Sequence, residues 1–433
     1  MGYEMSSRYE NSTQFLKRAE TVIPVGAQTF SKSRTQYPTG ISPLFAVRAK
    51  AAYLWDVDRN RYIDLVSNLA AVTLGYRYRR VDTRVKRQMK LGNGFSLPST
   101  LETIVAEQIK SLVPSAQMVR FGKNGTDATS AAIRLARAYT NRDYVAVCGY
   151  HGWQDWFIGS TSKNKGVPKS ISELTLTFSY NDIDSLNNIF AQHPNEIAAV
   201  ILEPMTSEYP RSNFLEKIKT ICDQNGTVLI FDETITGFRF SKGGAQEVFG
   251  VRPNLSTFGK GIANGYPLSV VCGDIEIMKE MEEIFFSGTF GGELLSLAAA
   301  NTVLTMHQED EVSPALVENG LSLSRDLSKV IDESGMRQFL TIKGHETWKF
   351  LHWQEGLDHS TPELKTFFMQ EMFKRGVLVL GTHNVTLAHT QRIQRKIVDV
   401  YEQVLTLMHR EISAGTLKSN LEAEPLQPLF KVR

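Results

Sequence analysis

The chain has 433 residues, a length that suits two domains or one large domain with a smaller one attached. Hydrophobic residues make up 42% and charged residues 22% of it, and the formal net charge of +2 gives no indication of a nucleic-acid partner. Its three cysteines are widely spaced and no apolar run approaches a membrane span, so we expect a soluble cytoplasmic protein with buried free thiols, without disulfides, a metal site or a membrane partner.

The first part of the chain mixes short helices with a hairpin. Residues 12–22 have the spacing of an amphipathic helix, and a polar loop follows over 28–38. Apolar and polar residues alternate from Phe45 to Ile63 around a polar turn, which predicts a β-hairpin. Two further helices are predicted over 81–92 and 99–112.

From Met118 the pattern becomes strand, glycine-rich turn and helix. The strand Met118–Phe121 is followed by a turn over 122–127 and then by an alanine-rich helix. Gly125 and Thr126 at the start of that helix would present backbone N–H groups and a hydroxyl to an anion. Ordinary capping of the helix by Thr126 or by the next residue explains the pattern equally well.

Two more strands end in polar or aromatic residues. The strand over 144–148 leads to Tyr150 and His151, which stand between glycines and suit contact with a flat ring, although packing under a loop would also explain them. The apolar run 197–202 ends at Glu203. Because ligands collect at the carboxyl ends of the strands of an open α/β sheet, both ends are candidate site positions.

The strongest pairing lies between residues 227 and 265. A β-branched apolar run over 227–231 predicts a buried strand that ends at Asp232. Lys260 follows between two glycines, in apolar sequence. A shielded lysine can hold pyridoxal 5′-phosphate (PLP) as a Schiff base, and a buried aspartate can keep the cofactor's pyridine nitrogen protonated. Taken singly, the aspartate would more often be a turn residue and the lysine a solvated one.

Beyond the lysine, a strand is predicted over 268–272 and a long helix over 294–307. After residue 308 the apolar runs become shorter and the charge increases, which indicates a smaller α+β domain. Its predicted elements are strands over 339–343 and 347–352, helices over 361–375 and 391–413, and a strand pair between 377–380 and 385–388.

These segments together resemble one family. The chain is similar to the class III aminotransferases of the fold-type I PLP enzymes, and especially to the glutamate-1-semialdehyde aminomutase branch, over about residues 10 to 412. The resemblance implies an α/β fold with a mainly parallel sheet covered by helices and a smaller α+β C-terminal domain. The matching segments are IPVGAQ (23–28), YLWDVDRNRYIDLV (53–66), KNGTDATSAAIRLARAYTNRD (123–143), GYHGWQDW (149–156), ILEP (201–204), FDETITGFR (231–239), FGKGIANGYPLS (258–269), SGTFGG (287–292) and LAHT (387–390).

The resemblance also implies a division of the chain and a set of roles. We expect an N-terminal segment over 1–55 at the substrate mouth, a large PLP-binding domain over 56–307 and a small domain over 308–433. Lys260 and Asp232 are the expected catalytic residues, and a homodimer with shared active sites is the expected assembly. The expected cofactor contacts are Asn124, Gly125, Thr126, Tyr150, His151, Glu203, Asp232, Ile235, Lys260 and, from the neighbouring subunit, Thr289.

Departures from the aminomutase pattern bear on the substrate. The segment before LAHT, residues 380–384, holds no carboxylate, and the N-terminal loop differs as well. The sequence therefore predicts an aminotransferase that passes an amino group, plausibly from L-glutamate, to a polar carbonyl substrate such as a keto-sugar of a surface polysaccharide. A glutamate-1-semialdehyde-type 2,1-aminomutase is the alternative, and a catalytically silent binding protein is a third possibility. Lys32, Arg34 and His383 are the candidate substrate contacts.

Overall fold

The computed structural model describes residues 7–427 and divides into two compact units. Among the described residues, the central unit spans Arg79–Pro314, and the terminal unit combines residues 7–78 with residues 315–427. Residues 56–78, which the sequence places with the large domain, group with the terminal unit. The reason is a long-range strand pair, because Ile63 lies beside Val377 in a parallel ladder.

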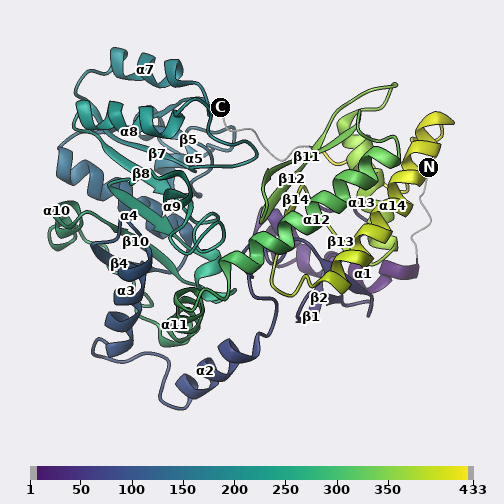
Figure 1. The fold of residues 1–433 in the computed structure, drawn as a ribbon, viewed down its shortest axis with the longest axis horizontal. Coiled ribbons are helices and arrows are strands. Elements are labelled where there is room, and N and C mark those ends of the chain that lie inside the picture. The colour runs from purple at the N-terminus through teal and green to yellow at the C-terminus, as the bar shows by residue number, and fades with distance from the viewer. Residues whose placement is uncertain (1–6, 428–433) are drawn as a thin grey trace. The chain divides into compact units, whose positions relative to one another are not determined.

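The central unit is built on a seven-stranded sheet with the strand order β4-β10-β9-β8-β7-β5-β6 (Figure 1). Strand β10 runs antiparallel to both of its neighbours, and the other pairs are parallel, as predicted. The strands are β4 (Met118–Gly122), β5 (Tyr144–Cys148), β6 (Thr175–Thr177), β7 (Ile197–Leu202), β8 (Val228–Asp232), β9 (Leu255–Phe258) and β10 (Ser269–Gly273).

Helices surround this sheet, and those expected from periodicity form within a few residues of their predicted bounds. The described helices of the unit are α2 (Arg79–Met89), α3 (Thr100–Leu112), α4 (Gly125–Thr140), α5 (Asp155–Ile158), α6 (Lys169–Ser172), α7 (Ile183–Gln192), α8 (Phe214–Gln224), α9 (Ala245–Phe249), α10 (Ile275–Met278) and α11 (Leu294–Gln308), with 3-10 turns η4 (Lys260–Ala263) and η5 (Lys279–Glu282).

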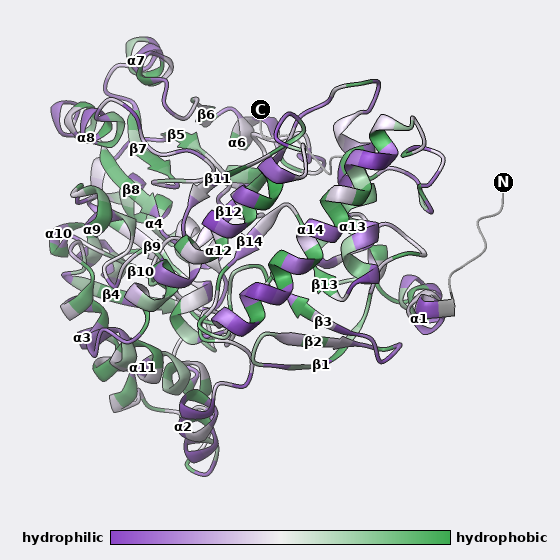
Figure 2. Ribbon diagram, turned by 45° about the vertical axis from the view of Figure 1, so that its right-hand side comes forward, coloured by the Kyte–Doolittle hydropathy of each residue, from purple (hydrophilic) through white to green (hydrophobic). Residues whose placement is uncertain are grey.

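The sequence of strand β8 is apolar because the strand packs against a core on each of its two faces. Successive side chains of a strand point to opposite faces, so Val228 and Ile230 join the core that includes α4, whereas Leu229 and Phe231 join the core that includes α8. Every residue of β7 and β8 is buried, and both strands are coloured hydrophobic in Figure 2. A strand covered on both faces needs no polar alternation, which explains the continuous apolar runs.

The terminal unit contains a four-stranded sheet, β1-β2-β3-β13, and a three-stranded sheet, β11-β12-β14. The predicted pairing of 377–380 with 385–388 is wrong, because β13 pairs with β3 and β14 pairs with β12. The elements are η1 (Ser7–Tyr9), α1 (Glu10–Glu20), η2 (Pro24–Gly26), η3 (Phe30–Lys32), β1 (Ala46–Lys50), β2 (Tyr53–Asp56), β3 (Arg61–Asp64), β11 (Leu340–His345), β12 (Trp348–Trp353), α13 (Thr361–Lys374), β13 (Val377–Leu378), β14 (Thr382–Asn384) and α14 (Gln391–Ser413), while α12 (Ser313–Glu333) starts at the boundary between the units.

Within residues 7–427, no helix is both long enough and apolar enough to cross a membrane. The three cysteines are free; Cys222 and Cys272 are buried and Cys148 is partly buried. A cytoplasmic location remains a prediction from the sequence.

Candidate active site

The predicted site residues of the central unit follow the carboxyl ends of neighbouring strands. Asp232 is the last residue of β8, and Lys260 lies two residues beyond β9. Tyr150 and His151 follow β5, and Glu203 follows β7. Because these four strands are parallel and adjacent, their carboxyl ends share one edge of the sheet. The topology therefore brings together side chains that lie more than a hundred residues apart in the sequence.

Asp232 is held as an ionised carboxylate. Its side chain is almost fully buried and accepts hydrogen bonds from the Thr234 backbone N–H at 3.1 Å, the Thr234 hydroxyl at 2.6 Å and the Thr257 hydroxyl at 3.1 Å. Burial by itself would raise the pKa of Asp232, but the hydrogen bond and charge of His151, with the bonds from Thr234, hold this pKa below its usual range. A carboxylate in this state can stabilise a cationic N–H group placed against it.

His151 lies directly against this carboxylate. Its Nδ1 lies 2.9 Å from Oδ2 of Asp232, and its Nε2 lies 3.1 Å from the carbonyl oxygen of Cys148. Both partners are acceptors, and a neutral imidazole has only one N–H to donate. The ring is therefore held between Asp232 and the backbone, with both nitrogens in contact with acceptors. The sequence predicts that His151 contacts the cofactor. In the structure, its two ring nitrogens face the aspartate and the backbone.

The second carboxylate of the Asp232–Glu233 pair has a different environment. Glu233 is fully buried and accepts hydrogen bonds from the Thr236 hydroxyl at 2.5 Å and from the backbone N–H groups of Ala245 at 2.6 Å and Gln246 at 2.9 Å. These contacts fix the start of the short helix α9. Adjacent residues of a strand point to opposite faces, so one carboxylate reaches the site edge and its neighbour stabilises the fold.

Lys260 combines an unusual backbone with a perturbed side chain. Its φ of 42° lies in the left-handed region, which is costly for a residue with a Cβ and often marks a functional position. Burial lowers the pKa of its ammonium, and the nearby charge of Arg239 acts in the same direction, whereas Glu203 and Asp232 oppose the shift. A lowered pKa leaves more of the amine uncharged, as a nucleophile or base requires.

Glu203 titrates in the neutral range. Its carboxylate lies 3.4 Å from the backbone nitrogen of Tyr150. Burial raises the pKa of Glu203 to about 7, and the negative charge of Asp232 adds to the increase, while His151 and Lys260 counter it. This carboxyl can therefore hold or release a proton near neutral pH.

The start of α4 has the features of an anion site. Thr126 is buried, and among the hydrogen bonds of residues 7–427 none involves its hydroxyl. A Cβ at Gly152, whose φ is +114°, would collide with that hydroxyl. Asp127 accepts hydrogen bonds from the backbone N–H groups of Lys123 at 2.9 Å and Asn124 at 2.8 Å, so the helix begins with a capping box between Asn124 and Asp127 that leaves Thr126 out. A buried hydroxyl without a partner at the N-terminus of a 16-residue helix fits a phosphate group.

The remaining predicted contacts of this unit differ in exposure. Tyr150 is 48% exposed, and its ring meets Phe157 edge to face with centroids 5.5 Å apart. Ile235 is partly buried, three residues beyond the end of β8. Thr289 is exposed on the loop before α11, beside Phe290, which is 67% exposed. In the isolated chain Thr289 therefore faces solvent, as a residue that serves a neighbouring subunit would.

The three candidate substrate contacts belong to the terminal unit. Lys32 donates a hydrogen bond from Nζ to Oδ1 of Asn68 at 2.7 Å, and burial lowers its pKa. Arg34 forms an ion pair with Glu20. His383 is buried and lies 2.6 Å from the hydroxyl of Tyr401, and its pKa is lowered to about 3 by burial and by the charge of His389. These contacts support a structural part for His383 rather than a substrate contact.

Two contacts of the site, and one backbone feature of the terminal unit, were missed from the sequence. The hydroxyls of Thr234 and Thr257 both reach Asp232, and Thr234 two residues after an aspartate is a pattern that could have indicated the contact. Residues 67–70 all have positive φ, between 48° and 68°, although none is glycine. Four such residues in succession are strained, and no local sequence signal marks them.

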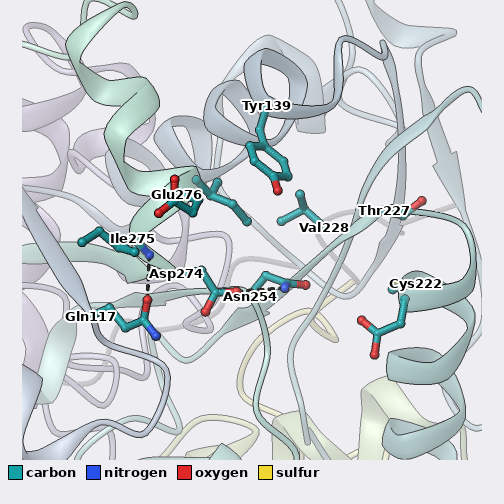
Figure 3. Close-up of a pocket in the computed structure, with 12 residues that line it drawn as sticks. Gln117, Tyr139, Cys222, Thr227, Val228, Asn254, Asp274, Ile275 and Glu276 are labelled. Carbon is teal, nitrogen blue, oxygen red and sulfur yellow. Dashed lines mark hydrogen bonds between the residues drawn. The ribbon is translucent and has the colours of Figure 1, made fainter.

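A separate pocket lies at the opposite edge of the sheet. It has a volume of about 420 Å³. Figure 3 shows side chains that line it. Its lining includes Gln117, which precedes β4, Val228, which begins β8, and Asn254, which precedes β9. It contains none of the predicted site residues. No group of three potential metal-ligating side chains occurs in the described part of the chain.

Comparisons with known proteins agree with this geometry. The sequence model of the Aminotransferase class-III family matches residues 36–398. The chain is 40% identical to a glutamate-1-semialdehyde 2,1-aminomutase from Alkaliphilus oremlandii, over 74% of this chain and 80% of the relative. It is 31% identical to a 3-aminobutyryl-CoA aminotransferase from Cloacimonas acidaminovorans, over 86% and 91% of the two chains. The fold matches the PLP internal aldimine form of the FumI protein of Sphingopyxis sp. MTA144 with a TM-score of 0.87, at 28% identity and over 97% and 99% of the two chains.

Proposed function

Since the chain belongs to the class III aminotransferases and takes PLP as its cofactor, we propose that its substrate is a short amino aldehyde of the glutamate-1-semialdehyde kind, rearranged as by a 2,1-aminomutase. The observation that carries this proposal is the 40% identity to a relative of that name over most of both chains. The keto-sugar acceptor expected from the sequence has less support, because the relatives described above bear no such activity in their names.

Several residues of the central unit are proposed to have separate roles in such a reaction. The bound cofactor supplies an electron sink for a carbanion formed beside the substrate nitrogen. Asp232, kept ionised by His151, holds the proton on the pyridine nitrogen. The N-terminus of α4 and the Thr126 hydroxyl bind the phosphate and so orient the ring. Lys260 holds the cofactor and then takes and returns a proton at Nζ.

Glu203 completes this arrangement as a group that titrates near the working pH. Its pKa of about 7 lets its carboxyl carry a proton during part of the cycle and release it in another part. Tyr150 and Ile235 are proposed to cover the two faces of the ring. Lys32 is proposed to contact an anionic group of the substrate, because the amide oxygen of Asn68, 2.7 Å from its Nζ, accepts a hydrogen bond but carries no charge that would offset that of the ammonium.

A second candidate function is an aminotransferase that uses an external donor such as L-glutamate and a polar carbonyl acceptor. The observation in its favour is the segment 380–384, which holds no carboxylate and whose one ionisable residue, His383, is buried against Tyr401. The similarity to a relative with an aminotransferase name agrees with this candidate.

We also propose that the active unit is a homodimer in which Thr289 reaches the phosphate of the neighbouring site. The loop that carries it exposes two large aromatic side chains, Phe285 at 84% and Phe290 at 67%. Apolar side chains exposed this far are typical of an interface that a second copy covers.

One experiment separates the two functions. The purified holoenzyme is first loaded with an amino group by L-glutamate, freed of the excess, and then given an amino aldehyde of the glutamate-1-semialdehyde class without any further amino donor. An aminomutase turns over many times under these conditions, whereas an aminotransferase stops after one equivalent per site until L-glutamate is added. A single turnover that L-glutamate converts to a continuous reaction would refute the mutase proposal in favour of the second candidate. No turnover with either, in a protein without a visible PLP band, would refute both.

A further inference from the structure

Lys123 joins three segments that each carry a predicted site residue. Its Nζ donates hydrogen bonds to the carbonyl oxygen of Pro267 at 3.2 Å, to Oε2 of Glu293 at 3.1 Å and to the hydroxyl of Ser296 at 3.3 Å. Lys123 itself precedes the anion site at the start of α4, Pro267 follows the Lys260 turn, and Glu293 ends the loop that carries Thr289. One ammonium therefore ties these segments together.

A lysine beside a phosphate site would ordinarily be expected to bind the phosphate. Lys123 is not available for this, because an ammonium has three N–H donors and three protein acceptors already use them. The side chains of Lys123 and Glu293 are only 19% and 20% exposed, so water screens their attraction less than at an open surface. Lys123 therefore contacts the loop that carries Thr289 and not the phosphate.

The loop over 285–293, which we call the presenting loop, is fixed at both ends. At its start, Arg120 of β4 donates to the carbonyl oxygen of Phe286 at 3.1 Å, and Arg134 of α4 donates to that of Phe285 at 3.2 Å. At its end, Lys123 holds Glu293, whose carboxylate also caps α11. Exposed Thr289 lies between these two anchors.

We propose that Lys123 is a positioning residue that fixes the presenting loop, and that it thereby sets the PLP affinity of the partner subunit's site. This inference rests on the proposed homodimer with shared sites. A loop held at both ends presents the Thr289 hydroxyl with little loss of conformational freedom on binding. Without the second anchor, the loop would have to be ordered when the phosphate binds, and the affinity would fall.

The first test measures the equilibrium release of PLP from the holoenzyme dimer on dilution. Lys123→Met removes the charge with similar bulk, and we expect PLP to bind about fivefold more weakly, the effect of losing a partly screened charged hydrogen bond. Lys123→Arg keeps the charge and should remain within about twofold of the parent. Lys219→Met, which breaks the exposed Lys219–Asp223 pair of the same unit, is the matched control and should have no effect.

A second variant guards against misfolding. Glu293→Gln retains an oxygen that can cap α11 but removes the partner charge of Lys123. Glu293→Gln should also weaken PLP binding. The double variant Lys123→Met with Glu293→Gln should bind PLP as tightly as whichever single variant has the lower affinity. Additive losses from the two substitutions would overturn the inference, because they would mean that the two side chains act separately.

Mixed dimers show which site is affected. In each, one chain carries Lys260→Ala, so only the site of the other chain gives the visible band. Lys123→Met placed on the chain with Lys260→Ala should weaken PLP binding in the intact partner's site, whereas Lys123→Met placed on the chain with intact Lys260 should leave that site unchanged. The reverse pattern, or equal affinity in all dimers, overturns the inference. A parent protein that is monomeric or holds no PLP would instead overturn the proposed function on which the inference rests.

Discussion

Replacement of His151 by glutamine tests the charge arrangement at the centre of the site. The bond between His151 and Asp232 is 2.9 Å long, and the two side chains are 0% and 5% exposed. A buried hydrogen bond between charged groups contributes about 2 kcal/mol net, which corresponds to about a 30-fold change in rate if it acts on the transition state. His151→Gln should therefore lower kcat by about 30-fold, while KM changes by less than about threefold.

The pH dependence gives a sharper signature. His151 holds the pKa of Asp232 below its usual range, so the ionised form persists as the pH falls. In the glutamine variant the opposing effect of burial is no longer balanced, and the pKa of Asp232 rises. Activity that needs the ionised carboxylate is then lost at a higher pH, and the acid limb of the kcat profile shifts upward. The measurement is kcat against pH, with the absorption band recorded at each point.

Two controls make the result specific. His193→Gln removes a histidine of the same unit that pairs with Glu196 at 3.1 Å near the surface, and it should leave both kcat and the acid limb unchanged. Combining His151→Gln with Asp232→Asn should be no slower than Asp232→Asn alone, since the histidine acts through the aspartate. A His151→Gln enzyme with the parent's kcat and an unmoved acid limb would refute the role assigned to His151.

Three further substitutions address the rest of the site. Thr126→Val should leave the melting temperature of the PLP-free protein unchanged, because the hydroxyl has no partner among the described residues, but should weaken PLP binding about fivefold in an equilibrium titration; equal affinity would contradict the phosphate assignment. Glu203→Gln removes a group with a pKa of about 7, so the step that this group causes near neutral pH should disappear from the kcat profile, whereas a profile like that of the parent would exclude its participation. Glu233→Ala should reduce the free energy of unfolding by about 3 kcal/mol, since it leaves several buried N–H and O–H donors without an acceptor, and a catalytic loss larger than the loss of folded protein would show that Glu233 also serves the chemistry.

The sequence was most informative where one local rule decides the structure. The run 227–231 is apolar on both faces and could only be a buried strand, so the position of Asp232 at its end was predictable. Lys260 between glycines and the start of α4 at Gly125 were also predicted from local patterns. The carboxyl-edge rule for parallel sheets then predicts that these positions lie together.

Long-range contacts could not be predicted from the sequence. Strand β13 has only two residues, and nothing local indicates that it pairs with β3 more than three hundred residues earlier. The contact of Thr257 with Asp232 depends on the register between β9 and β8, which no composition signal encodes. Residues 67–70 contradict their own backbone preferences, and only the surrounding structure can hold them in the left-handed region.

The charges at the carboxyl edge form two coupled pairs with opposite behaviour. Burial is the largest influence on the pKa of Asp232, but the hydrogen bond and charge of His151 and the bonds from Thr234 together outweigh it and keep this pKa low. Glu203 and Lys260 also attract each other, yet burial dominates for both: the pKa of Glu203 rises to about 7 and that of Lys260 falls. The shifts of pKa thus keep Asp232 ionised, whereas they favour the uncharged forms of Glu203 and Lys260. Environments that separate pKa values in this way distinguish a permanent electrostatic support from the groups that move protons. The same edge of one sheet therefore provides both a stable countercharge for the cofactor and a lysine that can alternate between amine and ammonium, which is the combination that amino-group transfer needs.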